Sequence, residues 1–171
     1  KYTSLIRQST EKLRELILEL LEFTRIETDH KELKIQQVPV SECLKDVILP
    51  FDILVENREI HFTAHIQPDV HWNTDLSCFK TITTNLLSNA FKYTPNGGNI
   101  DVSLAMSGEN LVFSISNDGK GIKPQDLGNI FDRYRILEGF EANKKDSRTG
   151  LGLAICKSMV DLLGGTIEVQ S

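Results

Sequence analysis

The sequence has few cysteines, no long apolar run and no excess of basic residues, and each absence excludes a class of protein. Its three cysteines, Cys43, Cys78 and Cys156, lie far apart without Cys-x-x-Cys or metal-ligand spacing, so we expect reduced thiols rather than a disulfide framework. No apolar run reaches the ~18 residues of a membrane span, and no signal peptide opens the chain. The 19 Lys and Arg residues against 24 Asp and Glu residues give a net charge of −5, which argues against a dedicated nucleic-acid binder.

The chain does contain enough apolar residues for one packed core. Of its 171 residues, 40% are hydrophobic and 25% are charged, a balance unlike that of disordered or collagen-like chains. A chain of this size buries roughly 70% of its unfolded surface. We therefore expect about one domain's worth of folded chain that needs no covalent staples.

Residues 1–29 differ from the rest, because their apolar side chains recur at helical spacing without Gly or Pro between them. The pattern predicts one amphipathic helix of roughly six turns. Either this is a surface helix that packs on its own domain, or its apolar seam around Leu13, Leu16 and Leu20 meets a partner helix in a bundle. A helix this long at a chain start has nothing before it on which to pack, which favours the bundle.

Residues 30–171 alternate between strand and helix patterns, which predicts a mixed α/β domain. Strands are expected near residues 33–40, 60–66, 100–106, 111–116 and 166–170, and helices near 41–57, 75–93, 125–131 and 151–163. Ser41 and Asp75 are candidate N-caps, and Pro50 is expected to kink the first of these helices. Turns are expected at residues 96–98 and 107–110, and glycines 164–165 are expected to end the last helix.

The first cluster with chemical potential lies on the predicted helix that ends at Tyr93. Asn85 and Asn89 are four residues apart and share one helix face, with Lys92 one turn further on. Asn is unfavourable inside a helix, so two of them on one face need partners. A cation with phosphate oxygens would supply them, since Mg²⁺ takes oxygen ligands. A pair of amides that face solvent is the alternative.

Two glycine-containing segments form the other clusters. Asp118, Gly119 and Gly121 follow a predicted strand, where glycine permits close approach and the carboxylate can accept a hydrogen bond from an exocyclic amine such as that of adenine. Taken alone, Asp-Gly-x-Gly is more often a plain turn. Residues 149–153 (TGLGL) run into a predicted helix, whose free N–H groups and positive dipole end can bind phosphate. Alone, this motif is a weak signal.

In order and spacing, the three clusters resemble the N, G1 and G2 boxes of two-component sensor histidine kinases, members of the GHKL or Bergerat-fold ATP-binding superfamily. Residues 130–134 resemble the F box of that family's lid, and the resemblance covers residues 34–171. It implies a two-layer α/β (α+β) sandwich, in which a Bergerat-type mixed sheet is backed by about three helices. Nucleotide would bind on the helix layer under a flexible lid near residues 123–148.

The resemblance continues backward, since residues 9–28 resemble the second helix of the family's dimerisation hairpin. It therefore implies two domains, a hairpin helix at residues 1–29 and a catalytic ATP-binding domain at residues 30–171. The family's first hairpin helix and its last strand have no counterpart in this sequence.

The resemblance also assigns roles to residues. Asn89 would ligate Mg²⁺, Asn85 and Lys92 would act on the phosphates as the catalytic pair, and Asp118 would take the adenine amino group. A cation of the basic stretch 143–148 in the lid could also meet the γ-phosphate. The expected nucleotide-binding residues are Asn85, Asn89, Lys92, Tyr93, Asp118, Gly119, Gly121, Ile122, Phe131, Arg133, Thr149, Gly150, Leu151, Gly152 and Leu153.

The residue at position 85 helps to separate branches of the superfamily. Gyrases, heat-shock chaperones and mismatch-repair ATPases resemble one another in having Glu there. A Glu can activate water, whereas the neutral amide of Asn85 cannot take a proton near pH 7. Asn85 therefore favours phosphoryl transfer to a protein acceptor, which depends on positioning and charge neutralisation, over ATP hydrolysis.

Two departures from the family pattern affect the expected function. The family's phosphoacceptor histidine motif is absent, and the four histidines, which have other contexts, are His30, His61, His65 and His71. We therefore expect a chain that cannot phosphorylate itself. In the F box, Phe131 and Arg133 match, but the following residues are one position out of step, which leaves the role of Arg135 open.

The implied function is that of a protein-histidine kinase, which binds Mg·ATP and passes the γ-phosphate to a histidine of the parent protein and then, by phosphorelay, to a response regulator. The implied partners are the phosphoacceptor helix, the receiver domain and a second copy in the intact protein, but no nucleic acid. The resemblance implies a cytoplasmic part of a sensor that reaches the membrane only through other segments of its parent. The alternatives are a non-catalytic module that binds ADP or ATP, and an ATP-driven clamp of the chaperone or topoisomerase kind.

Overall fold

The computed structural model describes residues 32–135 and 149–171, together with eight separate positions among the first 24 residues. These eight positions are helical, and the apolar ones among them, Ile6, Leu13, Ile17 and Leu21, are exposed. The other residues of the predicted N-terminal helix lie outside the described part of the chain.

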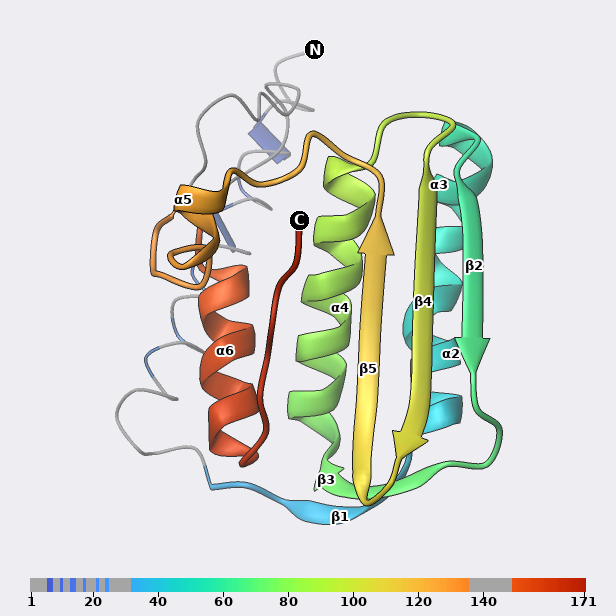
Figure 1. The fold of residues 1–171 in the computed structure, drawn as a ribbon. Helices are drawn as coiled ribbons and strands as arrows, with labels where there is room; N and C mark the ends of the chain where they lie inside the picture. The colour runs from blue at the N-terminus through green and yellow to red at the C-terminus, as the bar shows by residue number, and fades with distance from the viewer. Residues whose placement is uncertain are drawn as a thin grey trace.

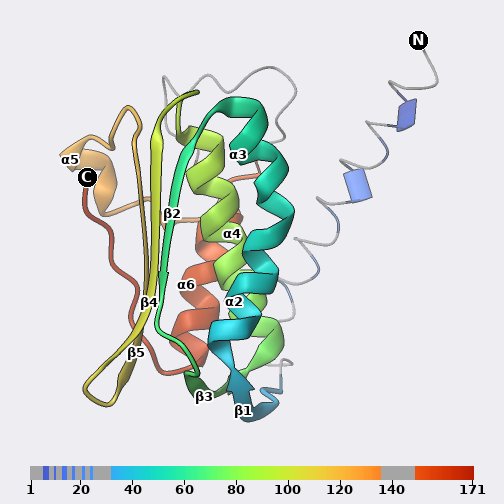
Figure 2. The same ribbon diagram turned by 90° about the vertical axis from the view of Figure 1, so that its right-hand side faces the viewer.

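The described residues form two layers, a β-sheet on one side and helices on the other (Figure 2). In the main sheet, β2 (His61–Ile66) runs parallel to β4 (Asn99–Ser107), which pairs antiparallel with β5 (Asn110–Asn117). A two-stranded antiparallel sheet of β1 (Ile35–Pro39) and β3 (His71–Asp75) lies at one end of the molecule (Figure 1). This architecture confirms the expected mixed sheet backed by helices.

Three helical columns lie on one side of the main sheet, and the last of them in the chain lies beyond the edge formed by β5 (Figures 1 and 2). Their elements are α2 (Val40–Ile48), the 3₁₀ turn η1 (Leu49–Phe51), α3 (Asp52–Arg58), α4 (Leu76–Tyr93) and α6 (Gly152–Leu162). The first column comprises α2, η1 and α3, while α4 and α6 form the other two. A short helix, α5 (Pro124–Leu127), lies near the start of α6 (Figure 1). In the described part of the chain, no helix has the length and apolarity needed to cross a membrane.

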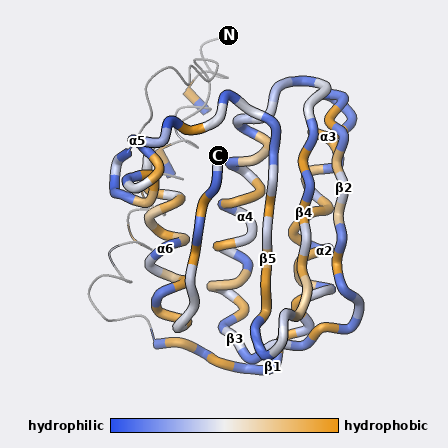
Figure 3. Tube along the Cα trace, viewed as in Figure 1, coloured by the Kyte–Doolittle hydropathy of each residue, from blue (hydrophilic) through white to orange (hydrophobic). Residues whose placement is uncertain are grey.

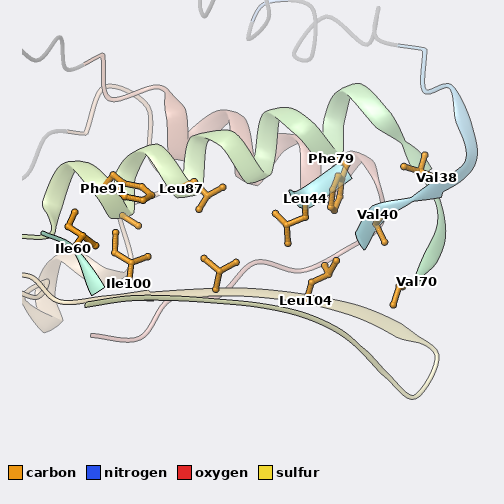
Figure 4. Packing of buried hydrophobic residues seen from close by; sticks show 12 residues of the cluster. Val38, Val40, Leu44, Ile60, Val70, Phe79, Leu87, Phe91, Ile100 and Leu104 are labelled. Atoms are coloured by element: carbon orange, nitrogen blue, oxygen red, sulfur yellow. The ribbon is translucent and has the colours of Figure 1, made fainter. Parts of the chain in front are cut away.

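The core fills the space between the sheet and the helices. On β4, the alternate residues Ile100, Val102 and Leu104 are buried while the residues between them face outward, and apolar and polar positions alternate along the strand (Figure 3). Leu87 and Phe91 of α4 are buried in the same core (Figure 4). Each such side chain contributes about 1.5–3 kcal/mol by leaving water. A second cluster, between α4 and α6, contains Cys78, Leu151, Ala154, Ile155 and Met159.

Several predicted boundaries are confirmed. The helix expected over residues 41–57 is interrupted at Pro50, which lies in η1 because proline lacks the N–H that a continuous helix needs. Asp75 caps α4, which ends at Tyr93 as predicted. Gly164 ends the last helix with a φ of +73°, a conformation that glycine adopts without strain.

The prediction that Ser41 caps α2 is wrong. The helix begins at Val40, and no side chain caps its first turn. Ser41 is instead buried, donating a hydrogen bond to the carbonyl of Gln67 at 2.6 Å and accepting one from the N–H of Val70 at 3.0 Å. Its hydroxyl therefore holds the connection between β2 and β3, a contact between distant residues that a capping pattern does not reveal.

Two strand predictions also differ from the structure. Residues 166–170 were expected to begin a strand, but in the described chain no backbone hydrogen bond joins them to β5, although they run along its free edge (Figure 1). Their alternating pattern leaves Ile167 and Val169 half-buried without a ladder of backbone bonds. Conversely, β3 was not predicted, because its five residues pair only with β1 and mostly lack a buried face.

Candidate functional site

The start of α4 is fixed by a buried carboxylate. Asp75 is 4% exposed, and it accepts hydrogen bonds from the N–H groups of Ser77, Cys78 and Lys34 at 2.8, 3.0 and 2.8 Å, with the Ser77 hydroxyl as a further donor. Burial acts to raise the pKa of Asp75, but these hydrogen bonds outweigh it and hold the pKa well below its ordinary value. The ionised side chain therefore anchors the helix that carries the first cluster.

The first cluster occupies the face of α4 opposite to the core residues. Asn85, Asn89 and Lys92 are half-buried, and the Lys92 ammonium lies 5.7 Å from the centre of the Tyr93 ring, within the range of a cation–π contact. Because residues four apart share a helix face, the two amides point to the same side. The structure thus places a cation and two amides along one side of the last three turns of α4.

The third cluster lies against Asn85. A side chain added at Gly152 would place its Cβ 3.7 Å from Asn85 Oδ1, so the first residue of α6 directly faces this amide. One turn later, Cys156 is buried and its thiol lies 3.8 Å from the carbonyl oxygen of Ile82. Burial raises the pKa of Cys156 to about 12, against a hydrogen bond with Asn85 that lowers it. Contacts between α4 and α6 therefore join the first and third clusters.

The residues that lead into α6 are tightly packed. Gly150 has a φ of +67°, and a Cβ at this position would lie 2.6 Å from the carbonyl carbon of Tyr134, so no other residue fits without a shift. Thr149 Oγ1 accepts a hydrogen bond from the N–H of Leu151 at 3.1 Å. No side chain caps the first turn of α6, which leaves the positive end of the helix dipole able to attract an anion.

The second cluster lies at the end of α4. Asp118 Oδ2 accepts hydrogen bonds from the side-chain amide of Asn99 at 2.7 Å and from its backbone N–H at 3.0 Å. These bonds, the side-chain bond foremost, lower the pKa of Asp118, so the exposed carboxylate is ionised at neutral pH. A Cβ at Gly119 would lie 3.3 Å from the Tyr93 carbonyl oxygen, which places this loop against the first cluster.

Further along the chain, two contacts place the F-box segment. The N–H of Tyr134 donates to the carbonyl of Gly150 at 3.0 Å, which joins the F box to the third cluster. Arg135 forms an ion pair with Asp126 of α5 at 2.8 Å, a contact that its local sequence did not predict. Phe131 is half-buried, and Arg133 is exposed. Residues 136–148, with the predicted basic stretch, lie outside the described part of the chain.

The remaining predicted site residues have less specific surroundings. Ile122 is half-buried, and its N–H donates to Ser171 Oγ at 2.6 Å, beside Gly121 with its φ of +67°. Leu151, directly before α6, is buried, and Leu153 on α6 is half-buried. The described part of the chain has no group of three or more His, Cys, Asp or Glu residues that could hold a metal ion.

The histidines that the structure describes belong to none of the three clusters, although His61 pairs in register with Asn99, the partner of Asp118. His61 and His65 are exposed on β2, and His71 is exposed on β3, where its Nδ1 lies 3.2 Å from the carbonyl oxygen of Asp69. His30 lies outside the described residues. The clusters that do meet are therefore the three predicted ones, through the pairs Gly152 with Asn85 and Gly119 with Tyr93.

Comparison with known proteins agrees with this geometry. A family model described as Histidine kinase-, DNA gyrase B-, and HSP90-like ATPase matches residues 74–171. The heme sensor protein HssS of Staphylococcus aureus is 32% identical over 168 residues, which make up 98% of this chain and 35% of that protein. The chain thus spans about a third of the length of the curated relatives that it matches.

Two solved structures share the fold. ShkA in complex with AMPPNP is 24% identical and superimposes with a TM-score of 0.81. The superposition covers 99% of this chain and 35% of the ShkA chain. Histidine kinase ThkA in complex with the response regulator protein TrrA is 23% identical and superimposes with a TM-score of 0.71. The superposition covers 96% of this chain and 45% of the matched chain. Since the family model matches more than half of the chain, the chain belongs to the histidine kinase-, DNA gyrase B- and HSP90-like ATPase family, and it shares its fold with histidine kinases of known structure.

Proposed function

We propose that this chain binds ATP together with Mg²⁺ and that, in its parent protein, it presents the γ-phosphate to a histidine outside this sequence. The observation that carries the proposal is the junction of α4 and α6, where Gly152 faces the amide of Asn85. An uncapped helix start beside a polar helix face offers N–H groups and amides to phosphate oxygens.

The adenine end of the nucleotide would lie at the second cluster. Asp118 is ionised, and both hydrogen bonds from Asn99 go to Oδ2. Oδ1 takes no part in these two bonds. A carboxylate in this state accepts a hydrogen bond from an exocyclic amine and cannot donate one. Gly119, Gly121 and Ile122 would shape the surrounding pocket.

The phosphates would lie between α4 and the start of α6. Asn85 and Lys92 would contact them from α4, and the backbone N–H groups of residues 150–153 would contact them from the other side. The N–H of Leu151 would do so by exchanging its hydrogen bond with Thr149 for one to phosphate. Thr149 lies at the entrance to this segment, while Phe131 and Arg133 would border it from the lid. Tyr93 would pack near the nucleotide.

A magnesium ion fits the donor chemistry of this helix face. Asn89 presents a neutral amide oxygen, half-buried and on the side of Asn85, and Mg²⁺ commonly takes only one or two protein ligands beside phosphate oxygens. When bound, the ion would neutralise negative charge on the phosphates.

The chemical step would be transfer rather than hydrolysis. A ring nitrogen of the acceptor histidine would bond to the γ-phosphorus as the bond to the bridging oxygen breaks, and ADP would leave. Asn85 cannot take a proton from water near pH 7, so it does not promote the competing attack by water. Its part, with Lys92, is to position and stabilise the transferring group.

The partners of the parent protein follow from this role. They are a phosphoacceptor helix, a second copy of the protein and a response regulator. The phosphoacceptor helix would form a hairpin with residues 1–29. The complex of ThkA with TrrA is one example of a kinase with such a regulator. Residues 30–171 would act on the cytoplasmic side of a membrane-anchored sensor.

The test supplies the acceptor. The chain is incubated with radiolabelled ATP, Mg²⁺ and a separate hairpin that carries the parent's phosphoacceptor histidine. We expect acid-labile label on the hairpin and none on the chain itself. Nucleotide binding without transfer would instead support a non-catalytic module, and ATP turnover that is lost in Asn85→Ala would support an ATP-driven clamp.

A further inference from the structure

The end of α4 that carries Lys92 and Tyr93 is held by a residue from a different helix. Arg58, the last residue of α3, is half-buried, and its guanidinium donates hydrogen bonds to the carbonyl oxygens of Phe91 and Thr94. These two carbonyls flank Lys92 and Tyr93 in the sequence. The guanidinium therefore holds the backbone on both sides of the two residues.

The connection extends beyond the helix. Arg58 Nε donates to the side-chain oxygen of Asn96 at 3.0 Å, and the N–H of Gly97 donates back to the carbonyl of Arg58 at 2.9 Å. The turn at residues 96–98 is thereby tied to the end of α3. All three N–H donors that the guanidinium uses point to a single short segment, residues 91–96.

Helix chemistry explains why an arginine suits this place. The last carbonyls of a helix have no partner within the helix, and Thr94, the residue after α4, is in an extended conformation without a glycine cap. Phe91 and Thr94 are each 2% exposed, so water has little access to their surroundings. A guanidinium presents several N–H groups in a fixed plane and adds positive charge at the negative end of the helix dipole.

The same segment supports the second cluster. Gly119 packs so closely on the Tyr93 carbonyl that an added Cβ would lie 3.3 Å from it. A shift of the backbone at Tyr93 would therefore move Lys92 and displace the Asp118–Gly119 loop together. The contacts of Arg58 thus bear on both ends of the proposed nucleotide site.

We propose that Arg58 is a positioning residue for nucleotide binding: it fixes the end of α4 that carries Lys92 and supports Gly119, without contacting the nucleotide itself. This inference rests on the proposed function. Arg58 is absent from every motif of the sequence analysis, because its partners lie more than 30 residues away in the chain.

The test compares nucleotide affinity with stability in three variants. Arg58→Met removes the donors and keeps much of the side-chain length, and Arg58→Lys keeps the charge but not the planar set of donors. Ser41→Ala is the matched control, because it removes a buried polar contact near the start of α2, at the other end of the molecule from the end of α4 (Figure 1). Affinity for Mg·ATP is measured by calorimetry, and stability by urea unfolding without nucleotide.

We expect Arg58→Met to weaken Mg·ATP binding about tenfold, Arg58→Lys to recover part of this loss, and Ser41→Ala to bind within about twofold of wild type. Equal affinity in wild type and Arg58→Met would overturn the inference, and so would an equal loss in Ser41→Ala at matched loss of stability. If Arg58→Met does not fold, Arg58→Lys decides: wild-type affinity in that variant would overturn the inference. Absence of binding by wild type would refute the proposed function itself.

Discussion

The pKa of the Asp118 carboxylate is lowered by one neighbour. Asn99 donates both a side-chain and a backbone hydrogen bond to Oδ2, and these bonds lower the pKa of Asp118. The lower pKa means that the group stays ionised as pH falls to its ordinary value near about 4. An acceptor for an exocyclic amine is therefore preserved throughout the neutral and mildly acidic range.

We expect Asn99→Ala to raise the pKa of Asp118 toward its ordinary value, because only the backbone bond remains. The carboxyl ¹³C shift of Asp118, followed by NMR during a pH titration, measures this directly. Ser103→Ala is a suitable control. Ser103 lies on β4, as Asn99 does, and its substitution removes a side-chain hydrogen bond to Ser114 of β5 without affecting Asp118. An unchanged titration of Asp118 in Asn99→Ala would show that another group sets its charge.

Two glycines of the third cluster differ in what a side chain would meet. At Gly150, a Cβ would lie 2.6 Å from the backbone of Tyr134, and the φ of +67° is itself strained for other residues. At Gly152, the nearest atom would be Asn85 Oδ1 at 3.7 Å, an ordinary contact.

We therefore expect Gly150→Ala to lower the free energy of unfolding by about 1–3 kcal/mol, because it combines backbone strain with overlap. Gly152→Ala, the matched control, should be neutral or stabilising by up to about 1 kcal/mol, because alanine favours the helix. Urea unfolding of both variants without nucleotide checks this. Similar stability for the two would mean that Tyr134 moves freely away from Gly150.

At the scale of the element, α4 depends on its N-terminal cap. Asp75 is buried and ionised, and its folded-state pKa lies below the value of about 3.9 expected for an unfolded chain. A group with a lowered folded-state pKa adds stability above the unfolded-state pKa, and this stability is lost as pH falls toward the folded-state pKa. The contribution of Asp75 is therefore complete at neutral pH and decreases below about pH 4.

We expect Asp75→Ala to lower the free energy of unfolding at pH 7 by about 1–2 kcal/mol, as loss of an N-cap does. Asp75→Asn keeps the capping oxygen but loses the charge. Its free energy of unfolding should be lower than that of wild type at pH 7, and the difference should be smaller at pH 3. Urea unfolding at both pH values provides the measurement. A difference between wild type and Asp75→Asn that does not change with pH would contradict this account.

The sequence predicted the elements whose signals are local. Asp75 was identified as a cap because its partners are the next residues in the chain, and Pro50 because its effect falls on its own turn. The same reasoning was wrong for Ser41, whose hydroxyl bonds to the loop between β2 and β3. A local pattern cannot show a competing partner that is near only in the folded chain.

The candidate site follows the same rule. The three clusters were found from their motifs, since each motif is a short run of residues with a chemical requirement of its own. The contacts that bring them together, such as Gly152 with Asn85, depend on how α6 packs on α4. Arg58 and the pair of Arg135 with Asp126 were missed, because nothing in their neighbouring residues indicates a partner.

At the scale of the whole molecule, the three cysteines report on the packing of the helical layer. Cys78 and Cys156 are each 0% exposed, whereas Cys43 is partly accessible on α2. Burial also raises the pKa of the Cys156 thiol to about 12, so little reactive thiolate is present at neutral pH.

A thiol-specific chromogenic reagent at pH 7.5 should therefore modify Cys43 in the folded chain and all three cysteines in urea. Cys43→Ser should abolish the fast reaction in the folded state, which makes it the control for site assignment. Fast reaction of a second thiol without denaturant would show that α6 separates from α4 in solution. That result would weaken the proposed site, because the junction of Gly152 with Asn85 depends on this contact.

Calorimetric titration of the chain with ATP and with ADP, in the presence and absence of Mg²⁺, tests the central claim most directly. We expect saturable binding by wild type, weaker binding in Asp118→Asn, and loss of the Mg²⁺ dependence in Asn89→Ala. Asp118→Asn retains an oxygen that can accept the Asn99 hydrogen bonds, so it probes the charge rather than the local fold. No binding by a wild-type chain that unfolds cooperatively in urea would contradict the account, as would equal binding in all three proteins.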